Sequence, residues 1–477
     1  MLVSKKLFVF TYSGFLSIIL RYLKYIFSYT MQKVTKAGFI IWFICAFFYA
    51  LEFIIRASGN SLYNDFSIAP YNLSPEQISV LSSAFYWAYV ASQLPAGILI
   101  DKFGVKKIML VSTLLFSVGV FIATRATSQE YLILYRVLAG VGGGFAFLSA
   151  LKSIAIWLPK RTFPLFTGAT QMLMYGAGTL TGLPLVILAN HFSIQVIMSV
   201  ILVVSILLFL SVVFFIPTVE PHNQKDTDEL ADTHTKIEDI PIVFKIKQIL
   251  LNGFFCFTIY GTTAIFADLW SYRFLSLDGY SVHYAGLASS MIFIGIAIFS
   301  PLWGVIATLL NKQKSLLVLA SIFGLFIVIA IVYMHVDPII MCILCILWGG
   351  MQAVHVLNFT ILRMHISPLY IATGIAAVNL FIPLSGAVLQ PFVGFVVSLL
   401  ENHGFEQLIA FKYALAILPV LMLLSIVLSL FITEKKTKIS FNNIQFVLIF
   451  TKRNIYYVKR FHLSCRSRYN KFTSNYL

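Results

Sequence analysis

An acidic and a basic residue lie four positions apart in an apolar stretch at about 37–59. Glu52 and Arg56 share one face of a helix there, so their side chains can pair. A charge in an apolar layer is costly unless it is paired or hydrated, and we therefore expect both to face a central cavity. Arg56 would receive a carboxylate through two parallel hydrogen bonds, and Glu52 would bind a proton or an amine. A structural ion pair near the outer mouth is the alternative.

A second arginine opens the glycine-rich stretch RVLAGVGGG. Arg136, Gly140 and Gly144 are spaced four residues apart and therefore lie on one face of a helix. The two small residues allow a neighbouring helix to approach closely. This packing would place Arg136 inside the protein rather than against lipid.

Uncharged polar side chains in other apolar stretches are further candidates for solute contacts. Hydroxyl, amide and imidazole groups can all bind a polar solute, and a hydrogen bond between helices is the alternative for each. These residues are Tyr86, Tyr89, Gln93, Gln171, His355, Asn358, Asn379 and Gln390.

Charged residues indicate an inner gate at 97–107, which reads GILIDKFGVKK. Gly97 would let a neighbouring helix come close, and Gly104 is a turn residue. The charges of Asp101, Lys106 and Lys107 predict a cytoplasmic turn between two spanning helices.

Two further charges are assigned to gates. Lys152 is expected near the inner gate, where it pairs with an acid such as Asp101 or extends to the membrane interface. Asp268 lies beside Trp270 and Arg273 near the outer end of an apolar stretch, and we assign it to the outer gate or its interface.

The composition is that of a polytopic membrane protein. Of 477 residues, 59% are apolar and 11% charged, with a mean hydropathy of +0.90. A soluble protein of this length would need far more charge on its surface, whereas the length suits about twelve spans. Five cysteines form no metal or disulfide pattern, and the chain contains no P-loop and no nucleophile–base set. We therefore expect neither enzyme activity nor a cofactor.

The net charge of +16 does not indicate nucleic acid binding, because the basic residues lie mostly on one side of the predicted membrane. All but six of the 34 Lys and Arg fall in segments assigned to the cytoplasm, together with both termini. Three of the exceptions fall in outer loops and three within helices.

We predict an all-α membrane protein with about twelve spans. The first six lie near 37–59, 78–100, 108–125, 131–156, 163–189 and 195–216. The second six lie near 247–271, 284–306, 315–334, 338–362, 370–399 and 409–432. Glycine and proline in the fifth and eleventh of these spans predict bent helices.

Five segments follow from these spans. A cytoplasmic extension at 1–36 precedes a six-helix bundle at 37–216, and residues 1–30 of it need not belong to the fold. An acidic cytoplasmic linker at 217–246 leads to a second six-helix bundle at 247–432. A basic cytoplasmic tail occupies 433–477.

The two halves of the chain repeat. The stretch PAGILIDKFGVKK precedes PLWGVIATLLNKQK by about 207 residues, so that Gly97 corresponds to Gly304 and Asp101 to Thr308. Nearly the same offset relates Gly142 to Gly349 and Gly168 to Gly374. Several matches at one offset indicate two six-helix pseudo-repeats.

The stretch 97–107 resembles the signature loop of the major facilitator superfamily, and RVLAGVGGG resembles the fourth-helix motif of that superfamily. The resemblance implies a secondary transporter that alternates access between two halves. It also implies that Arg136 contacts the solute or takes part in proton coupling.

Longer stretches are similar to particular branches of the superfamily. FIIRASGNSL resembles the first span of the organic-anion symporters, although the usual Tyr-x-x-Arg of that branch is Glu-x-x-Arg here. FYWAYVASQLPAGILIDKFG and GFAFLSALKSIAIWLP resemble the amino-acid and nucleoside importers of intracellular bacteria, and more loosely the lysosomal dipeptide transporters. This resemblance implies a location in the bacterial inner (plasma) membrane.

An acid and a base near one another suit a zwitterion, so we expect a carboxylate-bearing solute such as an amino acid or short peptide, moved together with a proton. An organic-anion or sugar-acid symporter and a drug–proton antiporter are the alternatives. Solute, proton and membrane lipid are the expected partners of a monomer.

Overall fold

The computed structural model describes residues 34–159, 162–218, 243–310, 312–366 and 371–434, which lie in one compact unit. Every regular element in these residues is a helix, which confirms the predicted all-α class. The predicted extension at 1–30, most of the linker and the tail beyond Glu434 lie outside the described residues.

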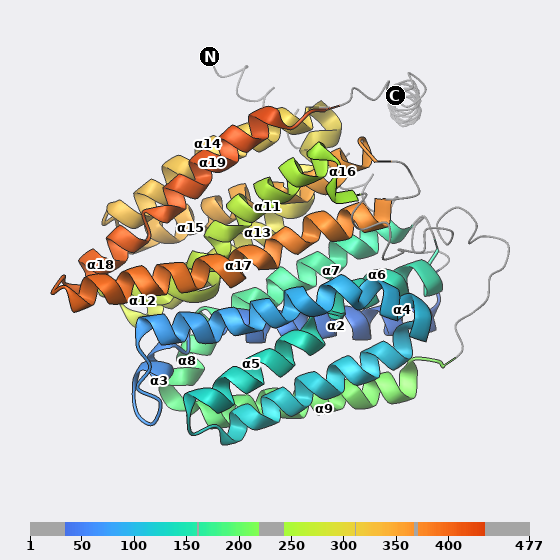
Figure 1. Cartoon of the computed structure of the whole chain (residues 1–477), viewed down its shortest axis with the longest axis horizontal. Coiled ribbons are helices and arrows are strands. Elements are labelled where there is room, and N and C mark those ends of the chain that lie inside the picture. Colours follow the sequence, from blue (N-terminus) through green and yellow to red (C-terminus); the bar gives the residue numbers. More distant parts are fainter. Residues whose placement is uncertain (1–33, 160–161, 219–242, 311, 367–370, 435–477) are drawn as a thin grey trace, which may run out of the picture. The chain divides into compact units, whose positions relative to one another are not determined.

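The first half of the chain forms one set of helices (blue to green in Figure 1). They are α2 (Lys36–Ala57), α3 (Tyr63–Ser67), α4 (Pro75–Arg125), α5 (Gln129–Gly143), α6 (Ala146–Trp157), α7 (Phe163–Gly178), the 3₁₀ turn η2 (Thr179–Thr181), α8 (Leu183–His191) and α9 (Ile194–Phe215).

The second half forms the other set (green to red in Figure 1). They are α11 (Lys247–Ile265), the π turn η3 (Phe266–Trp270), α12 (Ser271–Leu277), α13 (Val282–Leu310), α14 (Gln313–Tyr333), α15 (Pro338–Gln352), the 3₁₀ turn η4 (Ala353–His355), α16 (Val356–Arg363), α17 (Ile371–Asn402), α18 (Gln407–Ala414) and α19 (Ile417–Phe431).

Side-chain caps explain where several of these helices begin. Thr35 accepts a hydrogen bond from the backbone nitrogen of Gly38 at the start of α2. Ser74 and Gln77 form a reciprocal capping box at the start of α4, where Pro75 lacks the amide that would remain unpaired. Asp337 caps α15 through the backbone nitrogen of Ile339. Each cap satisfies amides that have no partner within the helix.

Eleven helices among the described residues are long and apolar enough to cross a membrane, against about twelve predicted spans. The difference lies in α4, which contains the predicted second and third spans joined at Gly104. Gly104 has φ 80° and ψ 160°, a backbone conformation that favours glycine. The predicted turn residue thus separates two helices that follow one another almost directly.

Several spans are broken near their middle. The fourth span divides into α5 and α6 at Gly144, and the fifth divides into α7 and α8 around η2. The seventh contains the π turn η3, and the tenth contains η4. The predicted eleventh span is one helix, α17, with Pro383 and Pro391 inside it. Irregular backbone at membrane depth is tolerated where protein or a cavity surrounds it.

The two halves meet along corresponding helices. In the first half α4 packs on α5 and α9, and α2 packs on α6 and α7; in the second half α13 packs on α15, and α11 on α17 and α19. Between the halves α4 packs on α17, while α7 and α8 pack on α13. Because α4 and α17 are the second and eleventh spans, and α7–α8 and α13 the fifth and eighth, this arrangement fits the predicted pair of repeats.

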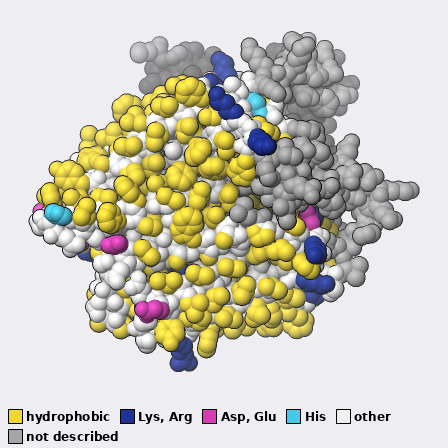
Figure 2. All heavy atoms as spheres, in the orientation of Figure 1, with side chains coloured by type: hydrophobic (Ala, Val, Ile, Leu, Met, Phe, Trp, Pro, Cys, Tyr) yellow, Lys and Arg dark blue, Asp and Glu magenta, His cyan; other side chains and the backbone are white. Residues whose placement is uncertain are grey.

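The outside of the molecule is apolar. Figure 2 shows a face covered by hydrophobic side chains, with Lys and Arg mainly near its margins. Large apolar residues are well exposed there or elsewhere on the surface, among them Phe214, Phe326 and Phe431. An apolar surface of this extent indicates contact with lipid rather than water.

Hydrogen bonds join described residues of the two halves only at mid-depth and toward the end remote from Gly104. Asn60 bonds both the hydroxyl of Ser271 and the backbone nitrogen of Tyr272, at 3.0 and 2.9 Å. Farther along, Ser290 bonds the backbone on either side of Gly182, and the Ser398 hydroxyl bonds the nitrogen of Glu76. We call this set of contacts, together with the hydrogen bond between Tyr86 and Asp268, the outer seal, after the orientation that the basic residues predict.

Candidate functional site

The predicted pair of charges on α2 is buried near the junction of the two halves. Glu52 Oε1 lies 3.9 Å from Arg56 Nη2, and both side chains are almost fully buried. Neither Glu52 oxygen has a hydrogen-bond partner among the described residues. The pair is therefore a loose ion pair, with capacity on both sides for further partners.

Aromatic rings from two helices surround the Arg56 guanidinium. Its carbon lies 4.3 Å from the ring centre of Phe53, 5.5 Å from that of Tyr89 and 5.8 Å from that of Tyr86. One guanidinium nitrogen also lies 3.6 Å from the Met174 sulfur. Ring faces attract a cation without using its hydrogen-bonding capacity fully, so Arg56 remains able to bind an anion.

Arg56 lines a cavity between the halves. From the first half the cavity is lined by Tyr49, Arg56, Tyr89, Gln171, Met174 and Tyr175. From the second half it is lined by Tyr260, His355, Asn379, Ile382 and Pro383. Its volume of about 20 Å³ accommodates roughly one water molecule in this conformation. A larger solute would require the halves to move.

One hydrogen bond crosses this cavity from half to half. His355 Nδ1 donates to the carbonyl of Gln352 at 2.9 Å, because a carbonyl can only accept. His355 Nε2 then accepts from the hydroxyl of Tyr175 at 3.4 Å. The first half thus contacts the second through groups that a polar solute could replace.

Five of the predicted solute contacts line the cavity, namely Arg56, Tyr89, Gln171, His355 and Asn379. Six others do not, among them Tyr86, Gln93 and Gln390. The Asn358 amide donates to the carbonyl of His355 from behind the cavity wall. Glu52 packs against Gly143, which has no side chain to exclude it, so only Arg56 of the α2 pair faces the cavity as predicted.

Arg136 is the last of these six. It is fully buried, as predicted, but its guanidinium donates to the carbonyl of Ile55 at 2.6 Å and to the Ser58 hydroxyl at 3.4 Å. These groups lie at the end of α2, where carbonyls lack partners within the helix. Arg136 therefore holds the helix that carries Arg56 and does not itself reach the cavity.

The predicted close packing of the glycine face is confirmed. A β-carbon at Gly140 would overlap the carbonyl oxygen of Phe85, and one at Gly144 would overlap the Ser92 hydroxyl. Both Phe85 and Ser92 belong to α4. The absence of side chains at these positions lets α5 lie directly against α4.

Asp268 lies in η3 of the second half and is fully buried. The hydroxyl of Tyr86, from α4 of the first half, donates to Asp268 Oδ2. Asp268 Oδ1 has no partner among the described residues. Arg273, its neighbour in the sequence, instead bonds Gln407 at 2.6 Å and lies over the Tyr63 ring.

Sequence reasoning missed four polar or polarisable residues of the cavity: Tyr49, Met174, Tyr175 and Tyr260. A signal was present for three of them. Tyr49 precedes Arg56 by two helical turns, and Met174 and Tyr175 follow Gln171 by one turn, which places each on the face of a predicted contact. Tyr260 has no such neighbour and is placed only by the packing of α11.

At the inner gate, Lys152 Nζ lies 2.6 Å from Asp101 Oδ1, the first of the two predicted alternatives. Lys106 Nζ donates to the carbonyl of Val213 at 3.0 Å, near the end of α9, whereas Lys107 lines a surface hollow beside Phe145. The close approach predicted at Gly97 is not seen among the described residues of this conformation, because none of their atoms lies within 4 Å of a β-carbon built there. The outer seal is closed, whereas the surroundings of Gly97 are open among the described residues.

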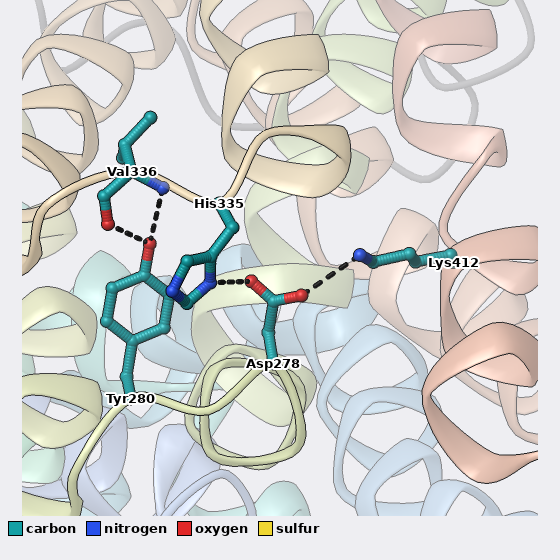
Figure 3. Close-up of polar contacts among 5 residues, drawn as sticks. All are labelled: Asp278, Tyr280, His335, Val336 and Lys412. Atoms are coloured by element: carbon teal, nitrogen blue, oxygen red, sulfur yellow. Dashed lines mark hydrogen bonds and ion pairs between the residues drawn. The ribbon is translucent and has the colours of Figure 1, made fainter.

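Asp278 ties two connections of the second half to the helix α18 (Figure 3). Its carboxylate lies 3.1 Å from His335 Nδ1 and 3.0 Å from Lys412 Nζ, and Tyr280 bonds the backbone of Val336 beside them. This cluster joins the loops after α12 and α14 to α18. It braces one end of the second half and lies apart from the cavity.

These features define a class: a helical membrane protein of two repeated bundles with a polar cavity at their junction. The chain belongs to the Major Facilitator Superfamily, whose family model matches residues 38–281 and 271–457. This membership confirms the predicted family and the prediction of a transporter rather than an enzyme.

Solved structures with the same fold include a D-xylose-proton symporter, with a TM-score of 0.66 at 13% identity over 84% of this chain and 98% of that one. The nucleoside transporter NupG has a TM-score of 0.63 at 15% identity, and the match covers 83% of this chain and 100% of that one. A bacterial homolog of the human lysosomal transporter Spinster, in an inward-facing conformation, has a TM-score of 0.63 at 15% identity. The match covers 83% of this chain and 96% of that one.

Curated relatives match over shorter stretches. The probable sulfoacetate transporter SauU of Cupriavidus necator is 31% identical over 109 residues, which cover 23% of this chain and 25% of that protein. The probable galactarate/D-glucarate transporter GudP of Pseudomonas putida is 29% identical over 119 residues, which cover 24% and 25%. The chain thus matches about a quarter of the length of these relatives.

Proposed function

We propose that this chain is a secondary active transporter of a small organic anion, bound by Arg56 and moved by alternating access. The observation that carries the proposal is the composition of the cavity wall. Among the lining residues, Arg56 is the only Lys, Arg, Asp or Glu. Its guanidinium can donate two parallel hydrogen bonds to a carboxylate or sulfonate.

Uncharged groups around Arg56 suit the remainder of such a solute. The amides of Gln171 and Asn379 and the hydroxyls of Tyr49, Tyr89 and Tyr260 can bond its polar substituents. Names of two relatives, a sulfoacetate and a galactarate/D-glucarate transporter, point to the same chemistry. Acids of this kind carry an anionic group together with oxygen substituents.

The amino acid or short peptide predicted from the Glu52–Arg56 pair finds less support. An α-amino group would need a carboxylate in the cavity wall, and neither Glu52 nor Asp268 lines it. A drug–proton antiporter, with an apolar cationic solute, is opposed by the arginine at the centre of the site. The site therefore favours the organic-anion alternative.

The closed outer seal and the open surroundings of Gly97 support alternating access. The present conformation would give access from the side of the 97–107 loop. A cytoplasmic location of that loop and of both termini, in a bacterial inner membrane, is the orientation that the basic residues predict. The transporter would act as a monomer with solute as its partner.

Counterflow in proteoliposomes tests the proposal. Vesicles loaded with unlabelled galactarate, D-glucarate, sulfoacetate, phosphate, alanine or dialanine are diluted into the same labelled compound, with xylose as a neutral control. We expect exchange of at least one organic acid and none of xylose. Exchange of alanine or dialanine alone would instead support the amino-acid hypothesis, and exchange of xylose alone would contradict an anion site.

Replacement of Arg56 tests its assigned role. Arg56→Lys keeps the charge and loses the paired geometry, so the half-saturating concentration of the exchanging acid should rise about tenfold. Arg56→Gln should abolish exchange. Arg273→Lys is the matched control, because Arg273 bonds Gln407 outside the cavity. If Arg56→Lys and the unaltered protein have equal affinities for the acid, Arg56 does not bind the solute through paired hydrogen bonds.

A further inference from the structure

Asp268 is a buried carboxylate that solute binding does not use. It does not line the cavity around Arg56, and no described Lys, Arg or His nitrogen lies within 4.0 Å of its oxygens. It lies in the π turn η3, an irregular segment of a kind that is frequent at functional sites. Its presence there calls for a separate explanation.

A single hydrogen bond supports this carboxylate. Tyr86 donates to Oδ2, while Oδ1 is fully buried and unpartnered. The titratable groups whose charges act on Asp268 are Glu52 and Arg56 on α2, Tyr86 on α4, Tyr175 on α7 and Tyr260 on α11. The single cation among them already pairs with Glu52. An ionised Asp268 is thus poorly compensated in this conformation, whereas the neutral acid can carry its hydrogen on Oδ1 and still accept from Tyr86.

The supporting hydrogen bond crosses from one half to the other, within the outer seal. On the two sides of Asp268, the Tyr63 ring packs on Trp270, and Asn60 bonds Ser271 and Tyr272. Opening the seal would separate these contacts, withdraw Tyr86 and admit water to the carboxylate. Water stabilises the ionised form, so opening and closing the seal changes the balance between the two forms.

We propose that Asp268 binds the proton that accompanies each solute anion. With the seal open, a proton from water forms an O–H bond at Oδ1, and the neutral acid is then enclosed as the seal closes. No electron transfer is involved. This inference rests on the proposed function, because an anion on Arg56 adds negative charge near Asp268 and favours its protonation. Departure of the anion toward the inner side removes its negative charge and lets water enter the space it occupied. Arg56 then favours the ionised form, and the proton passes from Oδ1 to that water.

The first test compares exchange with accumulation in proteoliposomes that contain galactarate, or the acid of the panel above that counterflows best. With the membrane potential held at zero, a pH difference of one unit, acid outside, should drive about tenfold accumulation by the unaltered protein if one proton moves with each anion. Asp268→Asn has the same shape and can accept from Tyr86. It should retain counterflow at equal pH and lose the accumulation. Asp65→Asn, a partly buried acid of α3, should leave both unchanged.

The outcomes separate the two proposals. Absence of counterflow by the unaltered protein would overturn the proposed function. Counterflow with full pH-driven accumulation by Asp268→Asn would overturn only the role of Asp268. If Asp268→Asn does not fold, titration of the unaltered protein with the same acid tests whether a proton is bound together with the anion. Calorimetry in buffers of different ionisation enthalpy should show proton uptake on binding, and its absence would contradict the inference.

Discussion

At the scale of single residues, two arginines predicted to act alike have different surroundings. Arg56 is surrounded by rings and faces the cavity, whereas Arg136 donates to carbonyls at the end of α2. The last carbonyls of a helix carry partial negative charge and lack partners within it. A buried guanidinium at that position satisfies them and stabilises the helix that positions Arg56.

Arg136→Gln should therefore lower stability more than it alters the solute site. Loss of hydrogen bonds from a buried charged group costs about 1.5–3 kcal/mol, which should lower the unfolding temperature in detergent by several degrees. A thiol-reactive dye can follow unfolding, because Cys45, Cys256, Cys342 and Cys345 are buried. Arg125→Gln, at the exposed end of α4, is the control. Equal unfolding temperatures would contradict the role in holding α2.

At the scale of elements, helix breaks and bare glycine faces position the site. The π turn η3 carries Asp268 toward α4, and the carbonyl of Gln352 at the start of η4 orients the His355 ring. Gly140 and Gly144 bring α5 onto α4, which places Arg136 against the end of α2. A displacement of α5 would therefore move Arg136 and the end of α2, and with them Arg56 in the cavity wall.

Two alanine substitutions separate packing from helix propensity. At Gly140 the added methyl group would overlap α4, so Gly140→Ala should cost about 1–3 kcal/mol and reduce the yield of folded protein. At Gly176 it would meet no atom within 4 Å, so Gly176→Ala should be neutral or slightly stabilising. Thermal unfolding of both variants provides the comparison. Equal destabilisation would show that glycine flexibility, not close packing, matters at Gly140.

At the scale of the molecule, the contacts between the halves describe one state of a cycle. They are dense in the outer seal, where a β-carbon at Gly394 would overlap Ser79 of the other half. At Gly97, which lies on the same helix as Ser79 but nearer to Gly104, a β-carbon would meet no atom of the described residues within 4 Å. Under the proposed function the cavity would be reached from the side of Gly97 in this conformation, and transport would require the opposite arrangement as well.

Thiol labelling tests this asymmetry. In a Cys465→Ser background, Gly97→Cys should react with a membrane-impermeant maleimide from the side of the 97–107 loop. Ser79→Cys, a change of similar size at the buried residue beside Gly394, should be protected from either side. Inside-out and right-side-out vesicles then also report the orientation of the loop. Rapid labelling of Ser79→Cys together with protection of Gly97→Cys would show that the opposite conformation predominates.

The sequence alone determined the class of protein, the positions of the spans and the charges that had to be buried. Hydropathy places the spans because lipid excludes polar backbone and side chains whatever their neighbours are. Charges within them stand out for the same reason, so Glu52, Arg56, Arg136 and Lys152 were found without a structure. Helical spacing also predicted which of their neighbours share a face, as in the close packing at Gly140 and Gly144.

The tertiary structure alone decided what these residues contact. Tyr86 and Asp268 are 182 residues apart and meet only because α4 packs beside the second half and a π turn carries the carboxylate. Arg136 binds backbone carbonyls. Every residue has one, so the sequence does not show which carbonyl an arginine will contact. The surroundings of Gly97 depend on which conformation is adopted. Contacts of this kind arise from the tilt, breaks and relative placement of helices, and local residue patterns do not encode them separately.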